Sequence, residues 1–152
     1  MSARCIQLNT EDGVLDLYVF RPEEETGPWP AVILYMDAFG IRPQLERMAQ
    51  RVASAGYFVA LPNLYYRSGA FAPFDPHQVA ADGPERDRFK GMIASLDGPK
   101  VMRDTSAVIR FLDEAREARS DRIAVVGYCM GGGYALIHSF PTRRSSDRKS
   151  VV

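Results

Sequence analysis

Residues 124–136 read AVVGYCMGGGYAL: an apolar run reaches a glycine, presents a cysteine and continues into further glycines. Gly127, Cys129 and Gly131 fit the Gly-x-nucleophile-x-Gly pattern of a sharp turn between a strand and a helix. Such a turn strains the backbone, so the residues two before and two after the nucleophile must be small. The helix N-terminus behind the turn favours a thiolate. The pattern predicts Cys129 as a nucleophile and the Met130 N–H as a donor to a developing oxyanion.

Other glycine-rich motifs fit this stretch less well. A dinucleotide-binding fingerprint needs glycine in place of Cys129, and a phosphate-binding loop needs lysine in place of Gly133. The remaining alternative is an inert, buried cysteine whose neighbouring glycines only allow close helix packing. The apolar run before the motif and the helix expected after it favour the nucleophile over that alternative.

The remaining apolar segments predict the strands of an α/β fold. Residues 5–20 form two alternating stretches around Asp12 and Gly13, which is typical of a β-hairpin. Short apolar runs at 31–36, 57–61 and 122–127 predict buried strands. We therefore expect an N-terminal hairpin followed by a mostly parallel sheet.

Helical spacing predicts the helices that flank this sheet. One helix is expected from Pro43, with Gly56 placed to cap its end, and a short one within 84–96 of an otherwise irregular region, 68–99. Another follows from the spacing of apolar residues over 101–115, and one more from about Met130 to Ser139. We expect acidic residues on the outside of the helix over 101–115: Asp104, Glu114 and Glu117.

Composition limits the classes of partner. The chain has 152 residues and a formal net charge of zero, which does not suggest nucleic acid or an anionic membrane as a partner. No apolar run has the length of a signal peptide core or a membrane span. Two cysteines make neither a disulfide framework nor a zinc site. We expect a cytoplasmic protein with no metal and no cofactor.

Three stretches, in this order along the chain, resemble the dienelactone hydrolase family, whose members are α/β-hydrolases with a cysteine nucleophile. AVILYMDAFGIRPQL resembles the family's strand and turn that place an acid before x-Phe-Gly; the acid here is Asp37, where many members have glutamate. LPNLYYR resembles Pro-Asp-Leu-Tyr-x-Arg, with Asn63 in place of aspartate and Arg67 at the arginine. VGYCMGGGYAL resembles the family's turn at the nucleophile.

The resemblance implies hydrolysis of a small ester or lactone by a monomer or small homo-oligomer; the family's typical substrates are carboxylate-bearing enol-lactones, and many members act on other small esters. Cys129 would attack the carbonyl, and the N–H groups of Ala38 and Met130 would form the oxyanion hole. Asp37 would control the ionisation of Cys129, since a nearby carboxylate disfavours a second negative charge. Arg67 would pair with the substrate carboxylate. Two alternatives stay open: a non-catalytic small-molecule binding module and a redox-responsive thiol protein.

The partners of a catalytic triad are missing from the sequence. In this fold the acid and the histidine follow the nucleophile along the chain. His138 lies nine residues along the helix that Cys129 begins, about 13 Å away by helical rise, and His77 precedes the nucleophile. Residues 140–152 show no periodicity. We therefore expect residues 1–139 to be a partial, inactive α/β-hydrolase domain, truncated after this helix, and residues 140–152 to be a non-native or disordered tail.

Overall fold

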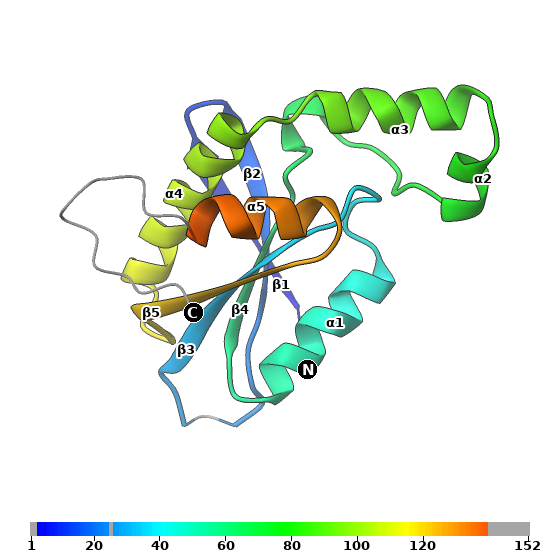
Figure 1. Ribbon diagram of the computed structural model, residues 1–152. Helices are drawn as coiled ribbons and strands as arrows, with labels where there is room; N and C mark the ends of the chain where they lie inside the picture. The colour runs from blue at the N-terminus through cyan, green and yellow to red at the C-terminus, as the bar shows by residue number, and fades with distance from the viewer. Residues whose placement is uncertain (1–2, 25, 140–152) are drawn as a thin grey trace.

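Two antiparallel strands, β1 Arg4–Thr10 and β2 Gly13–Phe20, form the predicted hairpin. The turn between them ends in Gly13, whose φ of 136° favours glycine. The computed structural model describes residues 3–24 and 26–139, and Figure 1 labels its elements. The predicted tail, 140–152, lies outside the described residues.

Three further strands complete a five-stranded sheet: β3 Trp29–Tyr35, β4 Phe58–Pro62 and β5 Ala118–Gly127. The strand order is β1-β2-β4-β3-β5. β2 pairs antiparallel with β4, whereas β3 runs parallel to both β4 and β5. Because β3 lies between two strands and under helices, its residues from 31 to 35 are all buried. The predicted hairpin and parallel strands are thereby confirmed.

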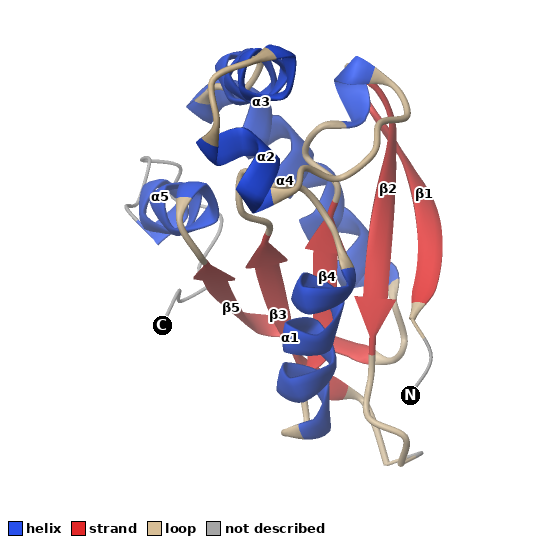
Figure 2. Ribbon diagram, turned by 90° about the vertical axis from the view of Figure 1, so that its right-hand side faces the viewer, coloured by secondary structure: helices blue, strands red, loops and turns tan. Residues whose placement is uncertain are grey.

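Helices cover both faces of the sheet. They are α1 Pro43–Ser54, α2 Pro76–Ala80, α3 Pro84–Ala94, α4 Gly98–Glu114 and α5 Met130–Ser139, with a 3-10 turn η1 at Tyr66–Ser68. α1 packs against β2 and β4, and α4 packs against β1 and β5 on the opposite face (Figures 1 and 2). α5 contacts α4, β3 and β5. α2 and α3 lie beyond the carboxyl ends of β3 and β5 (Figure 2).

The predicted helix from Pro43 forms as expected. Proline fixes its first turn, and three residues on one helical face are fully buried against the sheet: Leu45, Ala49 and Ala53. Gly56 follows the helix with a φ of 95°, the left-handed conformation of a helix C-terminus. The glycine cap is therefore confirmed.

The segment 68–99 contains more helix than its sequence suggested. The short helix expected within 84–96 is α3, but α2 was not expected. Its start has an ordinary signal, because the Asp75 side chain accepts a hydrogen bond from His77 N and Pro76 occupies the first helical position. Five residues are too short a span for apolar spacing to reveal a helix.

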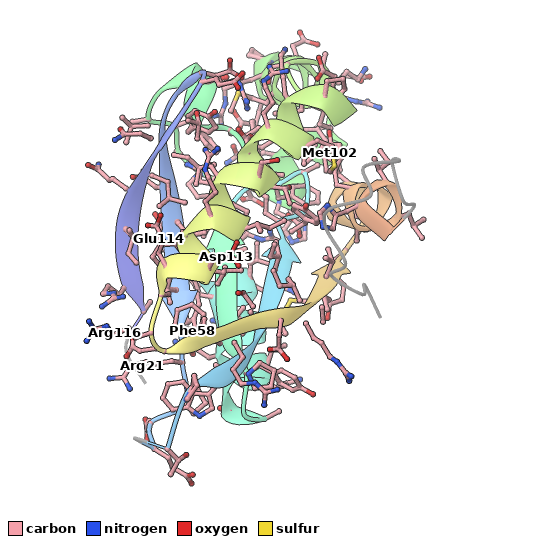
Figure 3. The ribbon with its side chains drawn as sticks, turned by 90° about the vertical axis from the view of Figure 1, so that its left-hand side faces the viewer. Arg21, Phe58, Met102, Asp113, Glu114 and Arg116 are labelled. Carbon is pink, nitrogen blue, oxygen red and sulfur yellow. The ribbon has the colours of Figure 1, made fainter. Side chains whose placement is uncertain are left out.

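The expectation that Asp104 lies outside α4 is wrong. Asp104 is fully buried, whereas Glu114 is exposed at the end of α4, which crosses one face of the sheet in Figure 3. The carboxylate of Asp104 accepts hydrogen bonds from the Tyr66 hydroxyl at 2.8 Å and from Arg67 at 2.8 and 2.9 Å. Helical spacing alone assigned this carboxylate to the solvent, but partners from a distant segment allow its burial.

β5 and α5 leave apolar surface exposed at one end of the sheet. β5 has β3 on one side and no strand of the described ranges on the other. Its last residues, 124–127, are half-buried rather than buried. Leu136 on α5 is 63% exposed and Ile137 is 45% exposed. A helix that is apolar on all sides needs cover on all sides. No helix of the described residues is long and apolar enough to cross a membrane.

We expect the isolated 152-residue chain to self-associate or to pack loosely. The edge of β5 that no strand within 3–24 or 26–139 pairs with offers backbone groups beside apolar side chains, which promotes edge-to-edge pairing. Sedimentation velocity and binding of a hydrophobic dye measure both outcomes. A soluble monomer with a sharp, cooperative thermal transition would contradict the expectation.

Candidate active site

Cys129 lies at a strained turn between β5 and α5. Its φ is 55°, and it is the one residue other than glycine with a positive φ among residues 3–24 and 26–139. The left-handed conformation costs a non-glycine residue about 1–2 kcal/mol. The thiol is exposed and free, at the point where β5 ends and α5 begins. The turn predicted from the glycine pattern is therefore present.

The two glycines that flank Cys129 are required by close backbone contacts. A Cβ at Gly127 would lie 2.0 Å from the Gly131 carbonyl oxygen. A Cβ at Gly131 would lie 2.5 Å from the carbonyl oxygen of Met36 and 2.7 Å from that of Tyr35. All of these atoms belong to the backbone, so no side chain can move aside. Glycine thus lets the start of α5 lie directly against the end of β3.

Tyr65 joins the two residues predicted to form the oxyanion hole. Its hydroxyl donates a hydrogen bond to the Ala38 carbonyl oxygen at 2.9 Å and lies 3.8 Å from the Met130 sulfur. Met130 is the first residue of α5, and the first N–H groups of a helix have no acceptor within the helix. The structure therefore brings Cys129, Met130 and Ala38 together at the carboxyl ends of β3 and β5.

The sequence suggests two roles for Tyr65, with Tyr66, Phe71 and Phe74: lining the mouth of a pocket or plain packing within a loop. It does not predict the contacts of Tyr65 with Ala38 and Met130. The signal available was a tyrosine three residues after the end of a buried strand, at the edge where the parallel strands end. Burial raises the pKa of Tyr65, and the charges of Tyr134, Asp37 and Cys129 raise it further, in that order. The hydroxyl is therefore protonated and acts as a donor at neutral pH.

Asp37 is held by an ion pair. Both carboxylate oxygens accept from Arg42, at 2.7 and 2.9 Å, and one of them also accepts from Phe39 N at 3.0 Å. Gly40, with a φ of 85°, turns the loop so that Arg42 reaches back to Asp37. These three hydrogen bonds fix the carboxylate beside Ala38. The sequence analysis identified Asp37 but not its partner.

Arg67 is also occupied, by two carboxylates from distant segments. Its guanidinium donates to both oxygens of Asp104 on α4 and to Asp12 in the hairpin turn, at 2.6–2.9 Å. Burial raises the pKa of Asp104, while the hydrogen bonds from Arg67 and Tyr66 lower it. Arg67 thus ties η1 to α4 and to the hairpin. Its predicted contact with a substrate carboxylate stays a prediction, which requires the substrate to displace Asp12.

Neither histidine is placed to serve Cys129. His138 is half-buried near the end of α5, and burial lowers its pKa. His77 is exposed in the first turn of α2. Among the described residues, no group of three or more histidine, cysteine, aspartate or glutamate side chains could hold a metal ion.

The fold and the turn at Cys129 define the class of protein: an α/β-hydrolase. The crystal structure titled "Putative Dienelactone Hydrolase" from Klebsiella pneumoniae superposes with a TM-score of 0.75 at 23% identity, over 91% of this chain and 54% of that one. The α/β-hydrolase GrgF from a Penicillium species superposes with a TM-score of 0.65 at 15% identity, over 91% and 42% of the two chains.

The chain belongs to the dienelactone hydrolase family, whose model matches residues 15–145. A protein named "Probable 2-oxo-3-(5-oxofuran-2-ylidene)propanoate lactonase" from Bradyrhizobium is 31% identical over 79% of this chain and 44% of its own length. A "Putative carboxymethylenebutenolidase" from Methylorubrum extorquens is 26% identical over 88% of this chain and 43% of its own length. The chain thus spans less than half the length of these two relatives.

Replacing Gly131 by Ala should destabilise the fold by about 1–3 kcal/mol, because the new methyl group collides with the backbone of β3. Gly133→Ala is the matched control: it lies two residues further along α5, where an added Cβ meets nothing within 4 Å. Alanine is also the better helix former, by about 1 kcal/mol. Urea unfolding should show opposite shifts of the midpoint in the two variants. Equal shifts would contradict the close contact.

Replacing Asp104 by Asn should lower the free energy of unfolding by about 3 kcal/mol, since it breaks a buried ion pair and leaves Arg67 with the exposed Asp12 as its remaining counter-charge. Asp121→Asn is the control, because Asp121 is exposed and pairs with exposed Arg119. Such surface pairs contribute about 0–1 kcal/mol. Urea titrations of both variants measure the difference. Similar losses in the two would show that the Arg67 network is not stabilising.

Proposed function

We propose that Cys129 is the nucleophile of a hydrolase that acts on the ester or lactone bonds of small molecules. The observation that carries this proposal is the left-handed backbone at Cys129, which presents an exposed thiol at the start of α5. Such strain persists where the surrounding structure enforces it, and it is concentrated at active sites. The names of the two relatives, a lactonase and a carboxymethylenebutenolidase, support the same bond type.

The reaction is an acyl transfer through a covalent intermediate. The Cys129 thiolate attacks the carbonyl carbon, and the carbonyl electron pair moves onto oxygen. The N–H groups of Ala38 and Met130 donate hydrogen bonds to that oxyanion. Collapse of the tetrahedral intermediate breaks the bond to the alkoxide, which takes a proton from solvent. Water then hydrolyses the thioester and releases the acid.

Asp37 is proposed to modulate Cys129, and Arg67 to contact a carboxylate of the substrate. The charge of Asp37 reaches the site, since it raises the pKa of Tyr65. Arg42 compensates that charge through two hydrogen bonds. The influence of Asp37 on the thiol therefore depends on its pairing with Arg42, whereas Arg67 acts only on a substrate that competes with Asp12.

Hydrolysis of the thioester requires a general base within hydrogen-bond reach. Neither His77 nor His138 supplies one, by their places on α2 and α5. We therefore expect the 152-residue chain to undergo a single round of acylation without turnover.

The test uses p-nitrophenyl acetate as the ester. We expect the chain to release one equivalent of nitrophenolate and to gain one acetyl group by intact mass, on the peptide that contains Cys129. Cys129→Ala should remove both signals. Cys5→Ser is the matched control: Cys5 is also an exposed, free thiol, but burial and the charge of Asp16 raise its pKa. This variant should be acylated like the wild-type chain.

Two results would overturn the proposal. Acylation that survives in Cys129→Ala would exclude this nucleophile. Oxidation of Cys129 by peroxide to a sulfenic acid, trapped by a dimedone probe while the ester leaves the thiol unmodified, would instead indicate a redox-responsive thiol.

A further inference from the structure

Tyr65 is placed by the segment that follows β4. β4 ends at Pro62, and the Asn63 side-chain oxygen then accepts a hydrogen bond from Tyr65 N at 3.1 Å. This turn directs the tyrosine ring into the protein, where it is 1% exposed. The ring of Phe71 packs edge-on against it, with 5.4 Å between the ring centroids. Tyr65 is therefore held both by its backbone and by its ring.

The hydroxyl of this buried ring connects two loops that lie far apart in the sequence. Its proton is donated to the carbonyl oxygen of Ala38, in the loop between β3 and α1. The Tyr65 hydroxyl oxygen also contacts the sulfur of Met130, at the first position of α5. A buried hydroxyl requires a partner, and the Ala38 carbonyl supplies it.

The geometry of an oxyanion hole depends on where its peptide groups lie. Donors must lie about 2.7–3.1 Å from the oxyanion, and a displacement of about 1 Å in a site can cost about 100-fold in rate. Ala38 has no polar side-chain group, and the hydrogen bond from Tyr65 holds its carbonyl, next to the peptide group that carries the Ala38 N–H. The preceding residue, Asp37, is fixed by the hydrogen bonds from Arg42 to its carboxylate. The hydrogen bond from Tyr65 therefore fixes the Ala38 side of the loop.

We propose that Tyr65 is a positioning residue for acyl transfer, which holds Ala38 by its carbonyl group and Met130 by its side chain so that the N–H groups of these two residues converge on the oxyanion. The proposal rests on the proposed function of Cys129. Tyr65 does not contact the reacting atoms. Its hydroxyl acts through Ala38 and Met130, and its effect is confined to steps that generate an oxyanion.

The test compares two reactions of the same thiol in the 152-residue chain. Acylation by p-nitrophenyl acetate passes through an oxyanion, whereas alkylation by iodoacetamide displaces iodide at a saturated carbon and forms none. The ratio of the two second-order rates therefore isolates the oxyanion hole from the ionisation and exposure of Cys129. Removal of an oxyanion donor costs about 100–1,000-fold. We expect Tyr65→Phe, which keeps the donors but loosens one, to lower the ratio by about tenfold.

Tyr66→Phe is the matched control. The Tyr66 hydroxyl also makes two hydrogen bonds, to Thr10 and to Asp104, but both partners lie in the hairpin and α4. The control loses a comparable pair of contacts and should keep the wild-type ratio. Equal falls in the two variants would indicate general loosening and would overturn the role of Tyr65.

A wild-type ratio in folded Tyr65→Phe would also overturn that role, while acylation at Cys129 would leave the proposed function intact. Failure of the wild-type chain to acylate at Cys129 would overturn both.

A second pair of variants applies if circular dichroism shows that Tyr65→Phe does not fold. Asn63→Ala removes the acceptor that orients Tyr65 N, and Asn63→Asp keeps an oxygen acceptor at the same place. The ratio should fall several-fold in the first variant and return to the wild-type value in the second. Identical ratios in Asn63→Ala and the wild-type chain would overturn the proposal.

Discussion

The strained turn at Cys129 is the constraint on which the rest of the site depends. A non-glycine residue with a φ of 55° costs about 1–3 kcal/mol. The packing of α5 directly against the end of β3 offsets this strain. Gly131 allows that contact, and a Cβ at this position would prevent it. The same contact brings the first N–H groups of α5 to the loop after β3. The position of the thiol and the position of the proposed oxyanion hole thus follow from one packing contact.

The segment after β4 serves two parts of the molecule at once. Tyr65 points into the site, where its hydroxyl binds the Ala38 carbonyl. Its neighbours Tyr66 and Arg67 point the other way and bind Asp104 on α4. Arg67 also binds Asp12 in the hairpin turn. The ion pair therefore holds η1 against α4, whereas the Tyr65 hydroxyl takes no part in that network and binds within the site.

The predictable features were those encoded by neighbours in the sequence. The spacing of Leu45, Ala49 and Ala53 and the glycine at 56 predicted α1 and its end, and the structure confirms both. The prediction for Asp104 failed because helical spacing identifies a face but not the arginine that reaches it from another segment. The pair of Asp37 and Arg42 was missed for a related reason: it depends on how the loop turns at Gly40.

The sequence by itself determined the turn at Cys129, because only glycine tolerates the required backbone contacts and because the flanking apolar run and helix are local patterns. It also determined the hairpin and the parallel strands, because the pattern of apolar residues that predicts a strand lies within one short stretch of sequence. Only the tertiary structure decided which side chains surround the thiol. Tyr65, Ala38 and Met130 come from three separate segments, and Arg67 binds two carboxylates from two others. Such contacts depend on how strands and helices pack, and packing is not a property of any single segment.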